Sequence, residues 1–276
     1  MAKCRYCGQG AGIFRNFHKP CKARYEAGWE TMVSSASKAA RTGDGLDTLD
    51  GDLAREAESS LVRKESIPES LVQGWERALH DCLEDNVLSA DEESKLMAFA
   101  QRFSLTQEQL NERGAYRRAA MNIVLREILE GKTPRSPTIS GTVPFNFQKS
   151  ESLVWVFTGV RYLESRTSRQ YVGGYSGVSV RVMKGVYYRT GGFRGRPVDT
   201  TQTVQVDAGI LGITTQNLYF EGTSKRFRIP YTKIVSFEPY TDGIGVQRDA
   251  MTAKPQTFVT GEGWFVYNAV VNLAKR

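Results

Sequence analysis

Three cysteines and one histidine near the start of the chain have the residue types and spacing of a zinc site. Cys4 and Cys7 are separated by two residues, and His18 and Cys21 repeat that gap after ten further residues. Thiolates and neutral imidazoles are ligands that zinc prefers, and four of them complete a tetrahedron. The spacing therefore predicts one structural Zn²⁺ per chain, bound by Cys4, Cys7, His18 and Cys21.

The same four ligands argue against a catalytic zinc, because they leave no open position for a water molecule. Three thiolates and one imidazole around Zn²⁺ carry a net charge of about −1. Basic residues flank the ligands and offset this charge: Lys3, Arg5, Lys19 and Lys22. The competing interpretation is a reduced surface turn with incidental cysteines.

A second group of residues with chemical potential is the basic segment 161–196. It contains a single acidic residue, Glu164, and eight basic ones, Arg161, Arg166, Arg169, Arg181, Lys184, Arg189, Arg194 and Arg196. Tyrosines and a phenylalanine alternate with them. Arginine forks bind phosphate and aromatic rings stack on bases, so we expect an anionic partner to bind at Arg181, Lys184, Arg189, Arg194 and Arg196. The alternative is a solvated strand face with core aromatics.

Catalytic motifs are missing from the sequence. It contains no Ser-His-Asp, Cys-His, HExxH or P-loop arrangement, and the C-terminal half has neither His nor Cys. We therefore expect a protein that is not an enzyme. Four acidic residues, Asp85, Asp91, Glu92 and Glu93, are candidates for binding a second, divalent cation. The alternative is that they stabilise a helix N-terminus through its dipole.

Helical signals follow the cysteine cluster. Tyr25, Trp29 and Met32 share one helical face, and a Gly- and Asp-rich linker is expected at 37–52. Capping boxes then predict helices that begin after Ser66, Ser89 and Thr106. On the face of the first of these helices, Cys82 is expected in the core and His80 in solvent. The stretch 83–105 resembles the tellurite-resistance TerB-like helical domains, in which an acidic turn precedes a capped helix.

Strand signals dominate after a second, Pro-containing linker at 133–152. The stretches 171–177 and 187–196 are Gly-rich, and Arg189, Arg194 and Arg196 are expected to flank Gly-rich turns. The repeat of Phe265, Ala269 and Leu273 predicts a closing helix. Two stretches, 209–222 and 226–238, resemble the GRAM and bacterial pleckstrin-homology-like domains. The resemblance implies a bent β-barrel capped by a C-terminal helix. The Gly-rich stretch before it departs from that family, so its ligand residues are not carried over.

These elements predict a multidomain α+β chain. Its parts are a zinc knuckle with a helix at 1–40, an all-α bundle at 53–132 and a PH/GRAM-like β domain at 145–276. The net charge of +7 divides as +3 over 1–50, −5 over 51–132 and +9 over 133–276. The excess of positive charge thus belongs to the β part, which favours an anionic partner there.

No apolar run approaches the about 20 residues of a membrane-spanning helix, and the N-terminus lacks the features of a secretory signal. A cytoplasmic location is expected. The whole arrangement resembles bacterial proteins that combine a zinc knuckle, a helical module and this β module, which implies a stress-response or phage-defence context.

Together the patterns predict a non-enzymatic adaptor or sensor. Its knuckle and helices would contact a protein partner, and its PH-like domain would recognise an anionic protein, lipid headgroup or nucleic acid. The alternative is a nucleic-acid-binding protein that uses the knuckle and the 161–196 segment. The sequence leaves the oligomeric state open.

Overall fold

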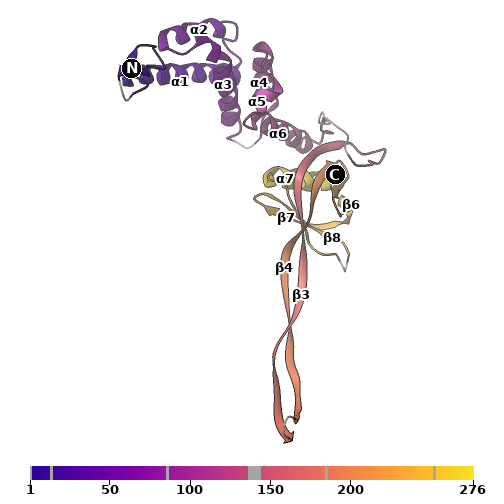
Figure 1. Ribbon diagram of the computed structural model, residues 1–276. Coiled ribbons are helices and arrows are strands. Elements are labelled where there is room, and N and C mark those ends of the chain that lie inside the picture. Colours follow the sequence, from indigo (N-terminus) through magenta and orange to yellow (C-terminus); the bar gives the residue numbers. More distant parts are fainter. Residues whose placement is uncertain (1, 13–14, 85–86, 136–143, 184–185, 251–252) are drawn as a thin grey trace. The chain divides into compact units, whose positions relative to one another are not determined.

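A computed structural model describes residues 2–12, 15–84, 87–135, 144–183, 186–250 and 253–276, with the backbone alone for 167–183 and 186–201. The chain forms two compact units, Met1–Lys132 and Thr133–Arg276 (Figure 1). No helix among the described residues is both long and apolar enough to cross a membrane. The division into three independently folding parts is not tested by these units and stays a prediction.

The first unit begins with two very short strands, β1 (Ala2–Lys3) and β2 (Gly10–Gly12), which pair antiparallel. Helix α1 (Lys19–Thr42) follows them directly. His18 is its N-cap residue and has an extended backbone, and Pro20 occupies the first turn, where a missing N–H costs no intrahelical bond. The metal-binding pattern therefore ends inside the first turn of the longest helix.

Helices that share a single hydrophobic core fill the rest of this unit. They are α2 (Leu49–Ser60), α3 (Ile67–Cys82), α4 (Ala90–Arg102), α5 (Gln107–Asn111) and α6 (Ala115–Leu129). Trp75 is fully buried at the centre and donates its indole N–H to the Leu96 carbonyl at 2.9 Å. Met32 is buried and Tyr25 and Trp29 pack partly against this core, which confirms the predicted face of α1.

Two local predictions in this unit are wrong. The expected linker 37–52 contains the last turn of α1 and the first of α2, so only 43–48 lies between helices. Ser66 makes no capping hydrogen bond, because a 3₁₀ turn (Lys64–Ser66) precedes α3 and holds Ser66 in a helical conformation. The side chain of an N-cap residue needs an extended backbone to reach the N3 amide.

The other two capping boxes are confirmed. Ser89 and Thr106 accept hydrogen bonds from the N3 backbone amides of Glu92 and Gln109, at 3.2 Å in both cases. The side chains of Glu92 and Gln109 in turn accept hydrogen bonds from the backbone amides of Ser89 and Thr106. The helix that follows Thr106 is interrupted, because Gly114, with a positive φ, separates α5 from α6.

The second unit is one antiparallel sheet with a helix. In the part of the chain that the structure describes, seven strands have the order β6-β5-β4-β3-β9-β8-β7. They are β3 (Leu153–Met183), β4 (Val186–Thr214), β5 (Asn217–Gly222), β6 (Arg226–Pro230), β7 (Ile234–Tyr240), β8 (Gly243–Arg248) and β9 (Gln256–Val259). No pairing between the two edge strands is seen among these residues. The α+β class is thus confirmed, but the sheet is not a closed barrel.

Strands β3 and β4 continue far beyond the sheet as a two-stranded ribbon (Figure 1). β9 pairs with β3 only at Arg161–Glu164, and β5 pairs with β4 only at Gly209–Ile213. From Arg166 opposite Gln202 to Arg181 opposite Tyr187 the two strands pair with each other and with no other described strand, over about 50 Å at about 3.3 Å per residue. The Gly-rich turns expected in this segment are therefore wrong, since cross-strand pairing extends through them.

The core of the second unit lies between the sheet and α7 (Gly263–Ala274). Phe265 of α7 packs against Trp155 and Phe157 of β3, with ring centroids 5.1 and 6.1 Å away. The predicted helical repeat is confirmed, because Phe265, Ala269 and Leu273 are all buried. The Tyr162 ring lies against a second aromatic group formed by Phe220, Phe227 and Phe258.

A single carboxylate holds the turn between β5 and β6. Asp207 of β4 accepts hydrogen bonds from the backbone amides of Thr223, Ser224 and Lys225 at 3.2, 2.8 and 2.7 Å. Hydrogen bonds from the Ser224 amide and from further backbone amides lower the pKa of Asp207 from 3.8 to about 2, although burial acts in the opposite direction. The ionised side chain replaces the hydrogen bonds that this tight turn cannot make by itself.

Replacing Gly74 by Ala should destabilise the first unit. The added Cβ would lie 2.4 Å from the Cβ of Ala36 on α1, so the two helices must separate. We expect a loss of about 1–3 kcal/mol in the free energy of unfolding, measured by urea denaturation. Gly51→Ala is the control, because nothing lies within 4 Å of its added Cβ and it should stabilise α2 by about 0.5–1 kcal/mol. Equal effects would contradict the close helix packing.

Asp207→Asn should destabilise the second unit in a pH-dependent way. A pKa lowered by folding adds stability above the unfolded pKa of about 4, and that stability disappears as pH falls towards 2. The urea midpoint of Asp207→Asn should therefore lie below that of the parent at pH 7 and approach it near pH 2. Asp249→Asn, at an exposed position in the same unit, should show no such convergence.

Candidate metal centre

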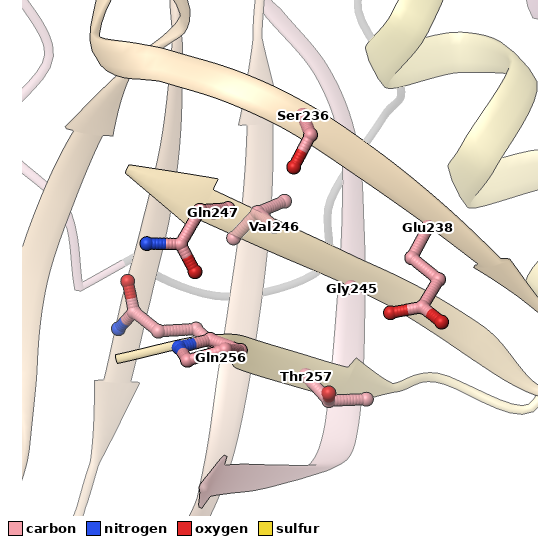
Figure 2. A pocket seen from close by; sticks show the side chains of 8 residues that line it. Ser236, Glu238, Gly245, Val246, Gln247, Gln256 and Thr257 are labelled. Carbon is pink, nitrogen blue, oxygen red and sulfur yellow. The ribbon is translucent and has the colours of Figure 1, made fainter. Parts of the chain in front are cut away.

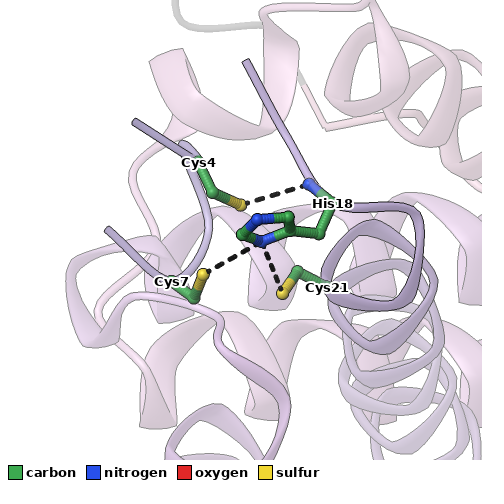
Figure 3. Close-up of side chains that lie close together, drawn as sticks. All are labelled: Cys4, Cys7, His18 and Cys21. Atoms are coloured by element: carbon green, nitrogen blue, oxygen red, sulfur yellow. Dashed lines mark hydrogen bonds between the residues drawn. The ribbon is translucent and has the colours of Figure 1, made fainter. Parts of the chain in front are cut away.

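The four predicted ligands converge at the start of α1. One ligand atom from each of Cys4, Cys7, His18 and Cys21 lies within 4.8 Å of all the others (Figure 3). The first pair comes from the turn after β1, and the second from the N-cap and the first turn of α1. The structure thus brings together every predicted ligand, and this group can hold one metal ion. Among the described residues no second group of this kind is found.

The ring of His18 is oriented for metal binding by one hydrogen bond. Its Nε2–H donates to the Gly10 carbonyl at 3.0 Å, which assigns the proton to Nε2. The other nitrogen, Nδ1, therefore presents its lone pair towards the thiols, 3.4 Å from Cys7 Sγ and 3.6 Å from Cys21 Sγ. A metal-bound histidine normally donates its other ring N–H in this way, and that hydrogen bond fixes its tautomer and its orientation.

Backbone hydrogen bonds shape the turn that presents the first two thiols. The amide of Gly8 donates to the Cys4 carbonyl at 2.8 Å, and the Cys4 amide donates to the Gln9 carbonyl at 2.6 Å. Gly8 has a φ of +75°, a conformation that suits residues without a Cβ. The His18 amide also donates to Cys4 Sγ at 3.4 Å, so the two halves of the site are already in contact.

The thiols differ in their readiness to ionise. Burial raises the pKa of Cys4, but the backbone amides of Cys7, His18 and Tyr6 outweigh this and lower the pKa to about 6. Burial and the neighbouring Cys7 raise the pKa of Cys21 to about 11. Negative charges placed this close together repel each other unless a cation lies between them. A bound metal ion would favour the ionised thiols, since metal ligands bind in their deprotonated form.

The remaining histidine and cysteine do not belong to a site. His80 on α3 is exposed, as predicted. Cys82 is buried in the helical core, where burial raises the pKa of its thiol to about 11, so it is a core residue as expected. A thiol buried among apolar side chains is chemically inert, and Cys82 is not part of the group that can hold a metal ion.

The acidic group around α4 is engaged in separate interactions. Glu92 completes the capping box with Ser89, Asp91 pairs with Lys95 at 2.6 Å, and Glu93 pairs with Arg126. Asp85 lies outside the described residues. The three described carboxylates therefore stabilise the start of α4 and its packing, which favours the helix-dipole interpretation over a second cation site.

The basic residues predicted to bind an anionic partner lie on the ribbon. Lys184 lies outside the described residues, and for Arg181, Arg189, Arg194 and Arg196 only the backbone is described. The pairing places Arg181 opposite Tyr187 and Arg189 opposite Ser179. Their role stays a prediction.

A polar groove of about 180 Å³ lies over β7, β8 and β9 (Figure 2). Its charged group is Glu238, and the other polar side chains are Ser236, Gln247, Gln256 and Thr257. These groups offer hydrogen bonds to a small polar molecule. They include neither a nucleophile with an adjacent base nor a pair of carboxylates.

Sequence reasoning missed a buried polar chain next to this groove. Gln256 donates to the Tyr162 hydroxyl at 2.5 Å, and that hydroxyl donates to Glu164 at 2.7 Å. Tyr162 and Gln256 are 94 positions apart in the chain, and the pairing of β3 with β9 brings them together. No local sequence signal identifies such a network.

No family model matches the chain, and no curated protein matches its sequence significantly.

Metal content tests the centre directly. Freshly purified, reduced protein should contain about one metal ion per chain, and Cys7→Ser should remove most of it, because a site with three remaining ligands loses much of its affinity. Elemental analysis gives the readout. Cys82→Ala is the matched control and should keep its metal, since Cys82 lies in the core away from the site. Metal-free parent protein would contradict the assignment.

Proposed function

We propose that this chain is a non-enzymatic, zinc-binding adaptor or sensor whose β unit recognises an anionic partner. The observation that carries the proposal is the closed set of four ligands at the start of α1. A site with four protein ligands supplies folding energy and shape rather than catalysis, because no position is left for a substrate or water.

The choice of zinc rests on the donors and their spacing. In a tetrahedral site, Zn–N and Zn–S bonds of about 2.0–2.1 and 2.3 Å place nitrogen and sulfur about 3.6 Å apart. His18 Nδ1 lies 3.4 and 3.6 Å from two of the thiols. Thiolates with one imidazole also favour zinc over magnesium and calcium, which prefer oxygen ligands.

The two-stranded ribbon supports the proposal of an anionic partner. Among the described residues no third strand pairs with either outer edge of this ribbon, and isolated two-stranded ribbons are marginally stable in water. Arg181, Arg189, Arg194 and Arg196 all belong to this paired segment. A partner with complementary charge would neutralise them and stabilise the ribbon on binding.

The finer family assignments belong to this proposal as well. An antiparallel sheet followed by a C-terminal helix is compatible with a PH- or GRAM-like domain, although the sheet does not close into a barrel. The capped α4 within a compact helical unit is compatible with a TerB-like module that contacts protein partners. A bacterial stress-response or phage-defence role follows from these resemblances alone.

Nucleic acid is the second candidate for the anionic partner. The ribbon segment interleaves its arginines with Tyr171, Tyr175, Tyr187, Tyr188 and Phe193. Proteins that bind single strands combine cationic grooves with aromatic rings on which bases stack. An anionic lipid surface needs the positive charge but not the rings.

Charge reversal on the ribbon separates these partners. In the full chain, Arg189, Arg194 and Arg196 all changed to Glu should weaken binding to the anionic partner by about tenfold or more, because phosphate contacts dominate such affinities. Titrations against single-stranded DNA, RNA and phosphatidylserine liposomes at two salt concentrations give the readout.

The matched control changes the net charge equally at exposed lysines of the same unit: Lys149, Lys225 and Lys233, all to Glu. The control should bind like the parent. Absence of binding to all three probes, or equal binding by the ribbon variant and the control, would rule out the ribbon as the recognition surface.

A further inference from the structure

A pocket beside the metal centre joins three separate segments of the first unit. It has a volume of about 420 Å³ and is lined by Arg5, Tyr6, Tyr25, Leu61, Arg63 and Ser66. The first two residues lie between the ligands Cys4 and Cys7, the third lies on α1, and the others follow α2. The pocket thus has one wall made by the metal-binding turn and another made by the helical core.

Aromatic rings form a row along this wall. The Tyr6 ring lies 4.9 Å from the Tyr25 ring, and Tyr25 is stacked on Trp29 at 6.4 Å with an angle of 7°. Phe17 meets the Tyr6 ring edge-on, with the centroids 6.5 Å apart. All four side chains are half-buried. Rings held in place by neighbours while part of each remains accessible provide a surface on which a planar ligand can stack.

The pocket is also positively charged. None of its lining residues is acidic, and no ion pair to a carboxylate is formed by Arg5 or Arg63 within the described part of the chain. The Arg5 guanidinium lies 4.8 Å from the centroid of the Tyr6 ring and donates to the Tyr6 hydroxyl at 2.6 Å. This contact orients Arg5 but leaves most of its five N–H donors for another acceptor.

The surrounding sequence extends this charge. Residues 1–25 contain no acidic residue and six basic ones, Lys3, Arg5, Arg15, Lys19, Lys22 and Arg24. A bound Zn²⁺ with its four ligands removes only about one unit of positive charge. Lys22 is paired with Glu26 at 3.4 Å, but the first 25 residues still carry an excess of positive charge, in contrast to the acidic helical segment that follows them.

We propose that this pocket binds a segment of single-stranded nucleic acid, with a base stacked on Tyr6 and Tyr25 and the adjoining phosphates held by Arg5 and Arg63. A nucleotide strand offers a planar aromatic group next to an anion, which is the combination that the pocket complements. An inorganic anion would leave the rings unused, and a duplex hides its base faces. This site is on a different unit from the ribbon, so it does not rest on the proposed function of the ribbon.

The geometry also makes the pocket depend on the metal. Arg5 and Tyr6 are the two residues between Cys4 and Cys7, and their backbone is positioned by the turn that those ligands close. Loss of the metal should release this turn and disperse the aromatic row at its Tyr6 end. Binding of nucleic acid and occupancy of the metal centre are therefore coupled.

The test uses the full chain and fluorescently labelled dT10 and rU10 at two salt concentrations. To remove any contribution of the ribbon, all variants carry Arg189, Arg194 and Arg196 changed to Glu. In this background Arg5→Glu with Arg63→Glu should weaken binding by about tenfold or more, because two phosphate contacts are lost. The slope of log affinity against log salt should become shallower by about 0.7 for each arginine.

The matched control is Lys38→Glu with Arg118→Glu, which changes the net charge equally at exposed positions on α1 and α6. A second variant, Tyr25→Leu, tests stacking without altering charge and should weaken binding while keeping the salt slope. Metal content and the thermal midpoint show whether each variant is folded. Photo-crosslinking of 5-iodouracil strands should map to Tyr6 or Tyr25.

Three results would overturn the proposal. The first is equal binding by the pocket variant and the control. The second is crosslinking confined to other residues. The third is a background protein that keeps its metal but binds neither strand, since the pocket is intact in that protein. Preference for dT10 or rU10 would show whether DNA or RNA is the natural ligand.

Discussion

The convergence of three thiols and one imidazole is the constraint on which the N-terminal end of the molecule depends. β1 and β2 contain two and three residues, and among the described residues before α1 only Cys4 and Ala11 are buried. So little apolar burial cannot hold a chain segment in one conformation. A metal ion bound by these four ligands would supply the missing free energy, because the ligands of one ion must lie within a few ångströms of it.

Helix α1 connects the four ligands to the helical core. His18 and Cys21 are part of the start of this helix, and its other residues approach α2 and α3 closely. An added Cβ at Gly28 would lie 2.0 Å from Ser60 of α2, and one at Gly74 of α3 would lie 2.4 Å from Ala36. Packing this tight leaves α1 little freedom to shift, so the metal-binding turn rests on a rigid support.

In the second unit, strands β3 and β4 each have a part within the sheet and a part that extends beyond it. Near the sheet, β3 and β4 carry Trp155, Phe157 and Leu211 into a core covered by α7, and the Asp207 carboxylate holds the adjacent turn. Beyond the sheet the same strands continue as a ribbon, and among the described residues no further strand pairs with it. The core of the second unit therefore lies at the first part of these strands.

Local patterns in the sequence determined the ligand set, the helix starts at Ser89 and Thr106 and the buried face of α7, because each depends on the spacing of residue types within one short segment of the chain. Only the tertiary structure decided the helical conformation around 37–52, the ribbon through the Gly-rich segment and the pocket beside the metal. The pocket joins segments far apart in the chain, whereas the helix ends and the ribbon are set by backbone hydrogen bonds that their Gly-rich residue types do not favour by themselves. Ser66 shows the reason well: its sequence matches a capping box, but the preceding 3₁₀ turn sets its backbone.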